Sequence, residues 1–302
     1  MIKSHHKPKS KTKSKAWLRE INDLIRGACG GFLFGIPLLY TMEVWWIGSQ
    51  AKPYKLLITI ALTFIAVYLI NRTEGFRKYS RSNRPYEAAI NTVEAMAIGI
   101  LCSAFMMVLL QEVTFDNFFK ESIGKVIFEG MSFTFGVALA NQFLGNSEDS
   151  FDARNDTENN KKSHSTSSDH LYATLSDIGT TLIGATVIAS NIAPTDEVTM
   201  LAASVSPKSL LLIVLTSLVI TYSIVFQAGF SNQQKRRQQQ GLFQRPSSET
   251  IMAYLISLLA SAFMLWFFQK IAISDPWTMW LEQTLLLGLP ASIGGAAGRL
   301  AI

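Results

Sequence analysis

The chain has 302 residues, of which 49% are hydrophobic and 16% are charged, and its formal net charge is +5 at pH 7. It is too apolar for an average soluble domain and too long for a single membrane anchor. The basic residues lie in the loops between apolar segments, and no separate domain that could recognise nucleic acid lies outside these segments. This argues against a nucleic-acid-binding protein. We therefore expect a polytopic membrane protein.

Apolar segments long enough to cross a bilayer recur along the chain. About 20 apolar residues in a helix match a hydrocarbon core of about 30 Å. We therefore predict an all-α membrane protein with eight transmembrane helices. The predicted spans are residues 24–47, 54–71, 87–111, 122–143, 171–192, 208–229, 248–270 and 277–299.

The distribution of Lys and Arg predicts how these spans are oriented. With the amino terminus in the cytoplasm, the first twenty residues and the loops 71–84, 144–170 and 231–246 lie inside. These segments hold nineteen Lys and Arg, whereas the outer loops hold six. Because cytoplasmic loops carry an excess of basic residues, we expect both termini in the cytoplasm.

Two polar segments divide the chain into parts. Residues 1–20 carry a basic residue at nearly every second position, which is typical of a disordered tail that contacts anionic lipid or only fixes the orientation. Residues 145–170 are polar and low in complexity, which predicts a flexible cytoplasmic linker. Between and beyond them we predict a first four-helix repeat at 21–144 and a second at 171–302.

The second part of the chain repeats the first. Residues 53–76 and 207–230 share seven identities over 24 positions without a gap, and both run from Pro to Gly-Phe. Further aligned pairs are Asp23 with Asp177, Thr41 with Thr195, Glu43 with Glu197, Gln111 with Gln269 and Gly136 with Gly295, together with SAFM at 103–106 and 261–264. Four spans per repeat leave both copies in one orientation, so we expect a pseudo-twofold axis along the membrane normal.

Ionisable residues inside apolar spans are the strongest functional signal in this sequence, because each costs several kcal/mol unless it is paired, hydrated or neutralised. Glu94 lies about 10 Å deep from the cytoplasmic side, and Glu129 lies about 10 Å deep from the outer side. With Asn91 and Thr134 nearby in sequence, they form the predicted path for a cation or protons. Equally open is that each glutamate is a protonated or hydrogen-bonded interior residue without a cargo.

Two further acids lie at matched places on the predicted outer side. Glu43 and Glu197 end the first and the fifth span. Related by a twofold axis, they would form an electronegative mouth that concentrates cations, whereas the alternative is two helix-end acids exposed to water. At the cytoplasmic end of the last span, we expect the side chain of Arg299 to extend to the membrane interface.

Several kinds of site are not expected. All four histidines lie in the tail, in the linker or at its edge, and no GxxxxGK[ST] motif occurs. We therefore expect no metal and no cofactor. No nucleophile and base occur together at membrane depth, so we do not expect an enzyme.

Three features resemble a known family. They are the segment GACGGFLFGIPLLYTMEVWW at 27–46, the duplicated Pro-apolar-Tyr-Gly-Phe span, and the third span with its SAFM motif. Together they resemble a family of uncharacterised bacterial integral membrane proteins, over nearly all of residues 17–302. The resemblance implies a multi-pass protein of the bacterial inner membrane, and it transfers neither an activity nor a site residue.

Two functional hypotheses follow from these features. The first is a transporter or channel for a small cation or protons, with its path at the interface between the repeats. The second is a non-transporting membrane protein that acts in assembly or binds lipid. As partners we expect membrane lipids, with anionic lipid at the basic tail, and no nucleic acid; the sequence leaves a homo-oligomer open.

Overall fold

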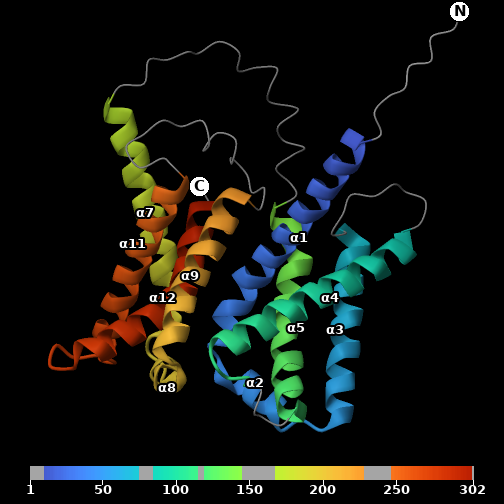
Figure 1. Ribbon diagram of the computed structural model, residues 1–302, viewed down its shortest axis with the longest axis horizontal. Helices are drawn as coiled ribbons and strands as arrows, with labels where there is room; N and C mark the ends of the chain where they lie inside the picture. The colour runs from blue at the N-terminus through green and yellow to red at the C-terminus, as the bar shows by residue number, and fades with distance from the viewer. Residues whose placement is uncertain (1–9, 75–83, 115–118, 145–166, 228–245, 301–302) are drawn as a thin grey trace, which may run out of the picture.

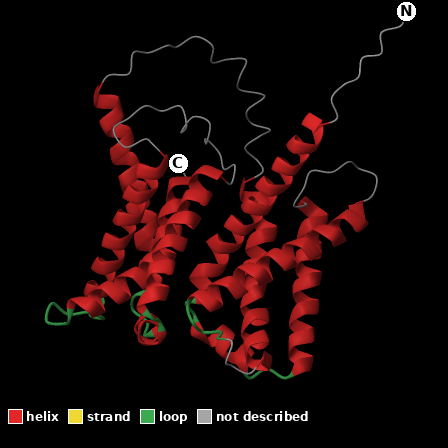
Figure 2. Ribbon diagram, in the orientation of Figure 1, coloured by secondary structure: helices red, strands yellow, loops and turns green. Residues whose placement is uncertain are grey.

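The computed structural model describes residues 10–74, 84–114, 119–144, 167–227 and 246–300 (Figure 1). In these ranges the chain is helical, joined by short turns, and contains no strand (Figure 2). Most of the predicted linker, the start of the basic tail, the middle of the predicted loop 71–84 and nearly all of the predicted loop 231–246 lie outside the described residues.

The helices form two groups that lie side by side in Figure 1. The first unit contains α1 (Ser10–Leu39), α2 (Met42–Ser49), α3 (Pro53–Glu74), α4 (Arg84–Leu109) and α5 (Phe119–Leu144). The second unit contains α7 (Ser167–Ile192), α8 (Glu197–Ser204), α9 (Pro207–Tyr222) with the π-helical turn η1 (Ser223–Gln227), α11 (Pro246–Phe267) and α12 (Trp277–Leu300). Each unit thus contains one short helix and four long ones in the same order.

Six helices are long and apolar enough to cross a membrane, namely α3, α4, α5, α7, α9 with η1, and α11. The pair α1 and α2 would make a seventh span, broken by a bend of 85°. The predicted eighth span corresponds to α12, which is not among the candidates. Residues 286–296 of α12 are all buried by neighbouring helices, so this helix needs no apolar surface toward lipid.

A threonine follows the end of the first long helix in each unit. The backbone N–H and the hydroxyl of Thr41 both donate to Leu38 O, at 2.9 and 2.5 Å. In the second unit Thr195 donates in the same two ways to Ile192 O, at 3.1 and 2.6 Å. These bonds satisfy carbonyls that a helix end leaves without a partner, so both breaks have the same local cause.

Glycines set the closest helix contacts in both units. A Cβ atom on Gly30 of α1 would overlap the backbone of Gly136 in α5, and one on Gly184 of α7 would overlap the backbone of Gly294 in α12. Such contacts allow close van der Waals packing where no hydrophobic effect drives helix association. These contacts make Gly294 the equivalent of Gly136. The sequence alignment paired Gly136 with Gly295, so the structural equivalence differs from it by one residue.

The third long helix of each unit, α4 or α11, also ends in the same conformation. Gln111 after α4 and Gln269 after α11 have φ angles of 61° and 58° and are the non-glycine residues with positive φ in the described ranges. The following N–H groups, of Glu112 and Lys270, donate to Met107 O and Leu265 O at 3.0 and 2.9 Å. This is the hydrogen bond that closes a helix in the Schellman motif.

The two units contact each other through different faces. The α9–η1 segment packs against α1 and α4, and the Tyr40 hydroxyl donates to Leu286 O of α12 at 2.6 Å. Accordingly 56% of the apolar window of α9 is buried, but only 11% of that of α3. A twofold axis would bury these equivalent helices equally, so the expected pseudo-twofold relation is not observed.

Candidate functional site

Glu129 on α5 is the most completely enclosed acid in the described part of the chain. Its side chain is 0% exposed, and neither carboxyl oxygen has a hydrogen-bond partner there. One turn further along α5, Phe133 covers Gly35 of α1 and meets the Phe32 ring edge-on, with 6.1 Å between the ring centroids. Glu129 therefore lies on the face of α5 that α1 covers.

Lys125 lies one turn before Glu129 on the same face of α5. Its Nζ donates to Glu112 O at 3.0 Å and to the Glu112 carboxylate at 3.3 Å, and lies 3.9 Å from Glu121. The same atom is 5.0 Å from the centroid of the Trp45 ring. These contacts compensate the lysine charge near the amino-terminal end of α5.

An open groove of about 570 Å³ lies beside the ion pair of Lys125 and Glu112. Lys125, Glu112 and Glu121 line it together with the two tryptophans of α2, and Met200 and Ser204 of α8 complete it. The groove therefore lies between the two units, with the lysine in its wall. By helix rise, Glu129 lies about 6 Å deeper along α5.

The structure does not gather the four predicted path residues on one face. Thr134 donates to Gly130 O at 2.6 Å and packs on Gly99 of α4. It follows Glu129 by five residues, which is about 140° around a helix. Glu94 is half-buried and Asn91 is 6% exposed, both on α4.

A small cavity of about 10 Å³ lies between α3, α4 and α5. Thr59, Thr63 and Thr134 are among the residues that line it. This is close to the space that one water molecule needs. Of the pockets that the described residues form at α2, at α3 and on α11, none is lined by Glu94 or Glu129.

The two acids of the predicted outer mouth lie on different short helices. Glu43 is exposed and lines a shallow pocket of about 240 Å³ with Trp46, Ile47 and Gln50. Glu197 begins α8 and is half-buried. Among the described contacts and pockets none joins the two, because the units meet through different faces.

The sequence analysis missed a buried charge cluster at the other end of the second unit. Arg299 of α12 lies 3.4 Å from Asp177 of α7 and forms an ion pair with Glu249 of α11, and its side chain is 0% exposed. The expectation that this arginine extends to the interface is therefore wrong. An acid in the first turn of α11 was the signal for the pair, but only packing shows that it faces Arg299.

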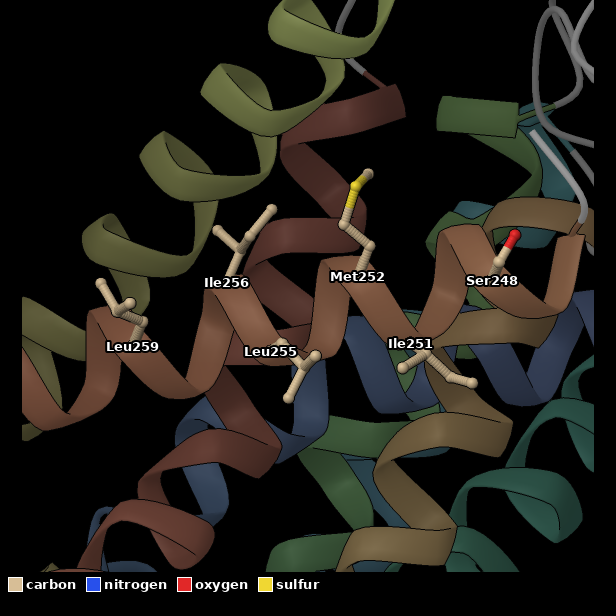
Figure 3. A pocket seen from close by; sticks show the side chains of 6 residues that line it. All are labelled: Ser248, Ile251, Met252, Leu255, Ile256 and Leu259. Atoms are coloured by element: carbon tan, nitrogen blue, oxygen red, sulfur yellow. The ribbon is translucent and has the colours of Figure 1, made fainter. Parts of the chain in front are cut away.

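The pocket of about 400 Å³ on α11 has a different character (Figure 3). Ser248, Ile251, Met252, Leu255, Ile256 and Leu259 line it. Five of these six side chains are apolar and none is charged, so this surface offers no charged ligand to a cation. Across the described residues, no group of three or more His, Cys, Asp or Glu is placed to hold a metal ion.

Comparison with known proteins adds a family and no activity. No curated protein and no solved structure shows significant similarity to the chain. Over residues 23–302 the chain matches the model of a family described as "Putative integral membrane protein (DUF2391)". This match covers nearly the whole chain and agrees with its several long apolar helices. The chain therefore belongs to this family of integral membrane proteins.

Proposed function

We propose that the protein moves protons across a membrane and that Glu129 takes up and releases the proton. The observation that carries this proposal is a fully buried carboxyl group without a hydrogen-bond partner in a helix of membrane-spanning length. An ionised carboxylate in such surroundings is costly, so the group is most stable with its proton bound. Gaining and losing a proton is the chemistry that this site offers.

The surroundings of Glu129 favour a proton over a metal ion. Cations such as Ca²⁺ require six or more oxygen ligands, and Mg²⁺ keeps several waters in an octahedral shell. Glu129 has no second acid in hydrogen-bonding contact, and no cluster of acids for a metal occurs in the described ranges. A single carboxyl group suffices for a proton.

Access from the outer side would come through the groove between the units. Lys125 lines the groove one helical turn from Glu129, and α1 and α2, which contributes the groove's two tryptophans, meet at a bend of 85°. Broken helices in transporters are typically found where a substrate site meets a cavity. Movement of α2 about Thr41 would then expose Glu129 to water in the groove.

The alternative function is a non-transporting membrane protein that acts in assembly or binds lipid. Two observations favour it: none of the four pockets described above is lined by Glu129, and another buried charge, Arg299, has acidic partners in the fold. Under this alternative Glu129 is a neutral packing residue. Neither function requires a cofactor or an enzymatic step, and we propose none.

The test is proton flux into liposomes that contain the purified protein, driven by a potassium diffusion potential and reported by an enclosed pH-sensitive dye. We expect flux with the wild type and background leakage with Glu129→Gln. Glu282→Gln, which removes a half-buried acid of α12, is the control and should retain the flux. Equal flux in wild type, Glu129→Gln and empty liposomes would favour the alternative.

We further propose that the protein lies in the bacterial inner membrane with both termini inside, as two tandem repeats. The equivalent threonine breaks, glycine crossings and glutamine helix ends support the duplication. Figure 1 supports a common orientation of the two repeats, because α2 and α8 lie at one end and the first turns of α1 and α7 at the other. In this arrangement α12 and the α1–α2 pair count as the seventh and eighth crossings.

A further inference from the structure

The groove between the two units has a charged wall in which the acids outnumber the bases. Lys125 lines it with two acids, Glu112 and Glu121. The Lys125 side chain is 10% exposed and donates hydrogen bonds to Glu112, whose side chain is 16% exposed. The Glu121 carboxylate lies 3.9 Å from Lys125 Nζ, beyond hydrogen-bond distance, and its side chain is 47% exposed. Glu121 is therefore the charge that the groove presents to a ligand.

Two tryptophans of α2 form the neighbouring wall. Trp45 is 5% exposed, and Lys125 Nζ lies over its ring, 5.0 Å from the centroid. Trp46, the next residue, is 58% exposed and lines both this groove and the shallow pocket beside Glu43. An indole face attracts a cation through the ring quadrupole. Trp46 thus offers to an external cation the kind of contact that Trp45 makes with Lys125.

The size and the chemistry of the groove select the kind of cation. Its volume of about 570 Å³ is within the range of pockets for small organic molecules, about 300 to 1,000 Å³. A metal ion is disfavoured, because no group of three or more His, Cys, Asp or Glu is placed to hold one in the described part of the chain. An anion is disfavoured, because Lys125 is nearly buried and already bonded. Met42 and Met200 also line the groove, and their flexible side chains adapt to apolar groups of different shape.

We propose that this groove binds a monovalent organic cation, with its ammonium group against Glu121 and Trp46 and its apolar part toward Met200. Neither unit forms this site by itself, since Glu121 and Trp46 belong to the first unit and Met200 to the second. A soluble amine and the ammonium group of a lipid headgroup share this chemistry. The proposal does not depend on proton movement through Glu129, because it concerns binding alone.

Isothermal titration calorimetry of the full-length protein in detergent micelles tests the proposal, with benzyltrimethylammonium as the probe. We expect saturable binding by the wild type and none by empty micelles. Glu121→Gln and Trp46→Leu should each raise the Kd about fivefold or more, because the first removes the opposite charge and the second the indole face. Both side chains are exposed, so the fold should be retained, and an unchanged melting temperature checks this.

Two matched control variants should bind the probe like the wild type. Trp277→Leu removes a tryptophan that is 74% exposed at the start of α12, and Glu282→Gln removes a half-buried acid of the same helix. Neither residue lines the groove. Benzoate, which carries the opposite charge, should not bind. The proposal is overturned by a wild type that does not bind the probe, by equal Kd values in all four variants, or by tighter binding of benzoate than of the probe.

The same titration in nanodiscs identifies the source of the cation. All discs contain the same fraction of phosphatidylglycerol, and the remaining lipid is either phosphatidylethanolamine or a neutral galactolipid without an ammonium group. A higher apparent Kd with phosphatidylethanolamine, seen in the wild type and absent in Glu121→Gln, assigns the groove to the lipid headgroup. An equal Kd in both kinds of disc assigns it to a soluble cation.

Discussion

At the scale of single residues, the chain buries charge in two ways. Arg299 is enclosed with acidic partners on two other helices, so its charge is compensated inside the fold. Glu129 is equally enclosed, but its carboxyl oxygens have no hydrogen-bond partner in the described structure. Under the proposed function, only the second arrangement supplies a group that exchanges a proton.

Removing Arg299 should therefore destabilise the protein strongly. Arg299→Met removes the positive charge that faces the buried Glu249 and the half-buried Asp177, and we expect a loss of about 3 to 5 kcal/mol in unfolding free energy. Lys270→Met is the control, since its partner Asp196 is 85% exposed, and it should cost less than about 1 kcal/mol. Denaturant unfolding in detergent micelles measures both, and equal losses would contradict the assignment.

The positive φ angles of Gln111 and Gln269 lead to a second prediction at this scale. Gln269 is exposed, so Gln269→Gly should relieve backbone strain and stabilise the protein by roughly 0.5 to 1 kcal/mol. Gln111→Gly should bring no gain, because the Gln111 side chain accepts from Ser206 N at 2.8 Å and donates to the Ser206 hydroxyl at 3.0 Å. The melting temperatures of the two variants provide the comparison, and a stabilised Gln111→Gly would speak against this contact between the units.

At the scale of the helices, the close crossings depend on glycine in both units. Gly30→Ala and Gly184→Ala place a Cβ atom inside the backbone of the facing helix, and we expect each to cost about 1 to 3 kcal/mol. Gly179→Ala is the control, because a Cβ there has no neighbour within 4 Å. Thermal unfolding of the three variants tests this, and a loss at Gly179 as large as at Gly30 would contradict it.

The long helices could be predicted from sequence, but their environments could not. The length of the apolar segments identified α3, α4, α9 with η1, and α11 to within a few residues. This works because a helix that crosses lipid must consist mostly of apolar residues. The same criterion gave no distinction between α3, which is mostly exposed, and α9, which the first unit covers. Contacts between units depend on packing that hydropathy does not record.

For the candidate site, the sequence likewise identified the buried acid but not the residues around it. Glu129 was identified because an acid within an apolar span is costly, and its complete burial agrees with that reason. The pairing of Lys125 with Glu112 and Trp45 was missed, because these residues come from three separate segments. The one-residue shift from Gly295 to Gly294 likewise needed the helix crossing itself.

At the scale of the whole molecule, the proposed orientation predicts which residues are labelled from outside. With both native cysteines replaced, Gln50→Cys lies between α2 and α3 at the outer end, and Tyr86→Cys lies at the start of α4 at the inner end. In intact spheroplasts a membrane-impermeant maleimide should label Gln50→Cys, and Tyr86→Cys only after permeabilisation. The opposite pattern would reverse the topology and the direction of access to Glu129.

The central claim is that Glu129 exchanges a proton, and infrared difference spectroscopy of the protein in lipid films tests it most directly. Between acidic and alkaline buffer we predict a protonated-carboxyl C=O band that shifts in D₂O and is missing in Glu129→Gln. The same band should persist in Glu282→Gln. A spectrum of Glu129→Gln identical to that of the wild type would contradict the claim, because Glu129 would then keep one protonation state throughout.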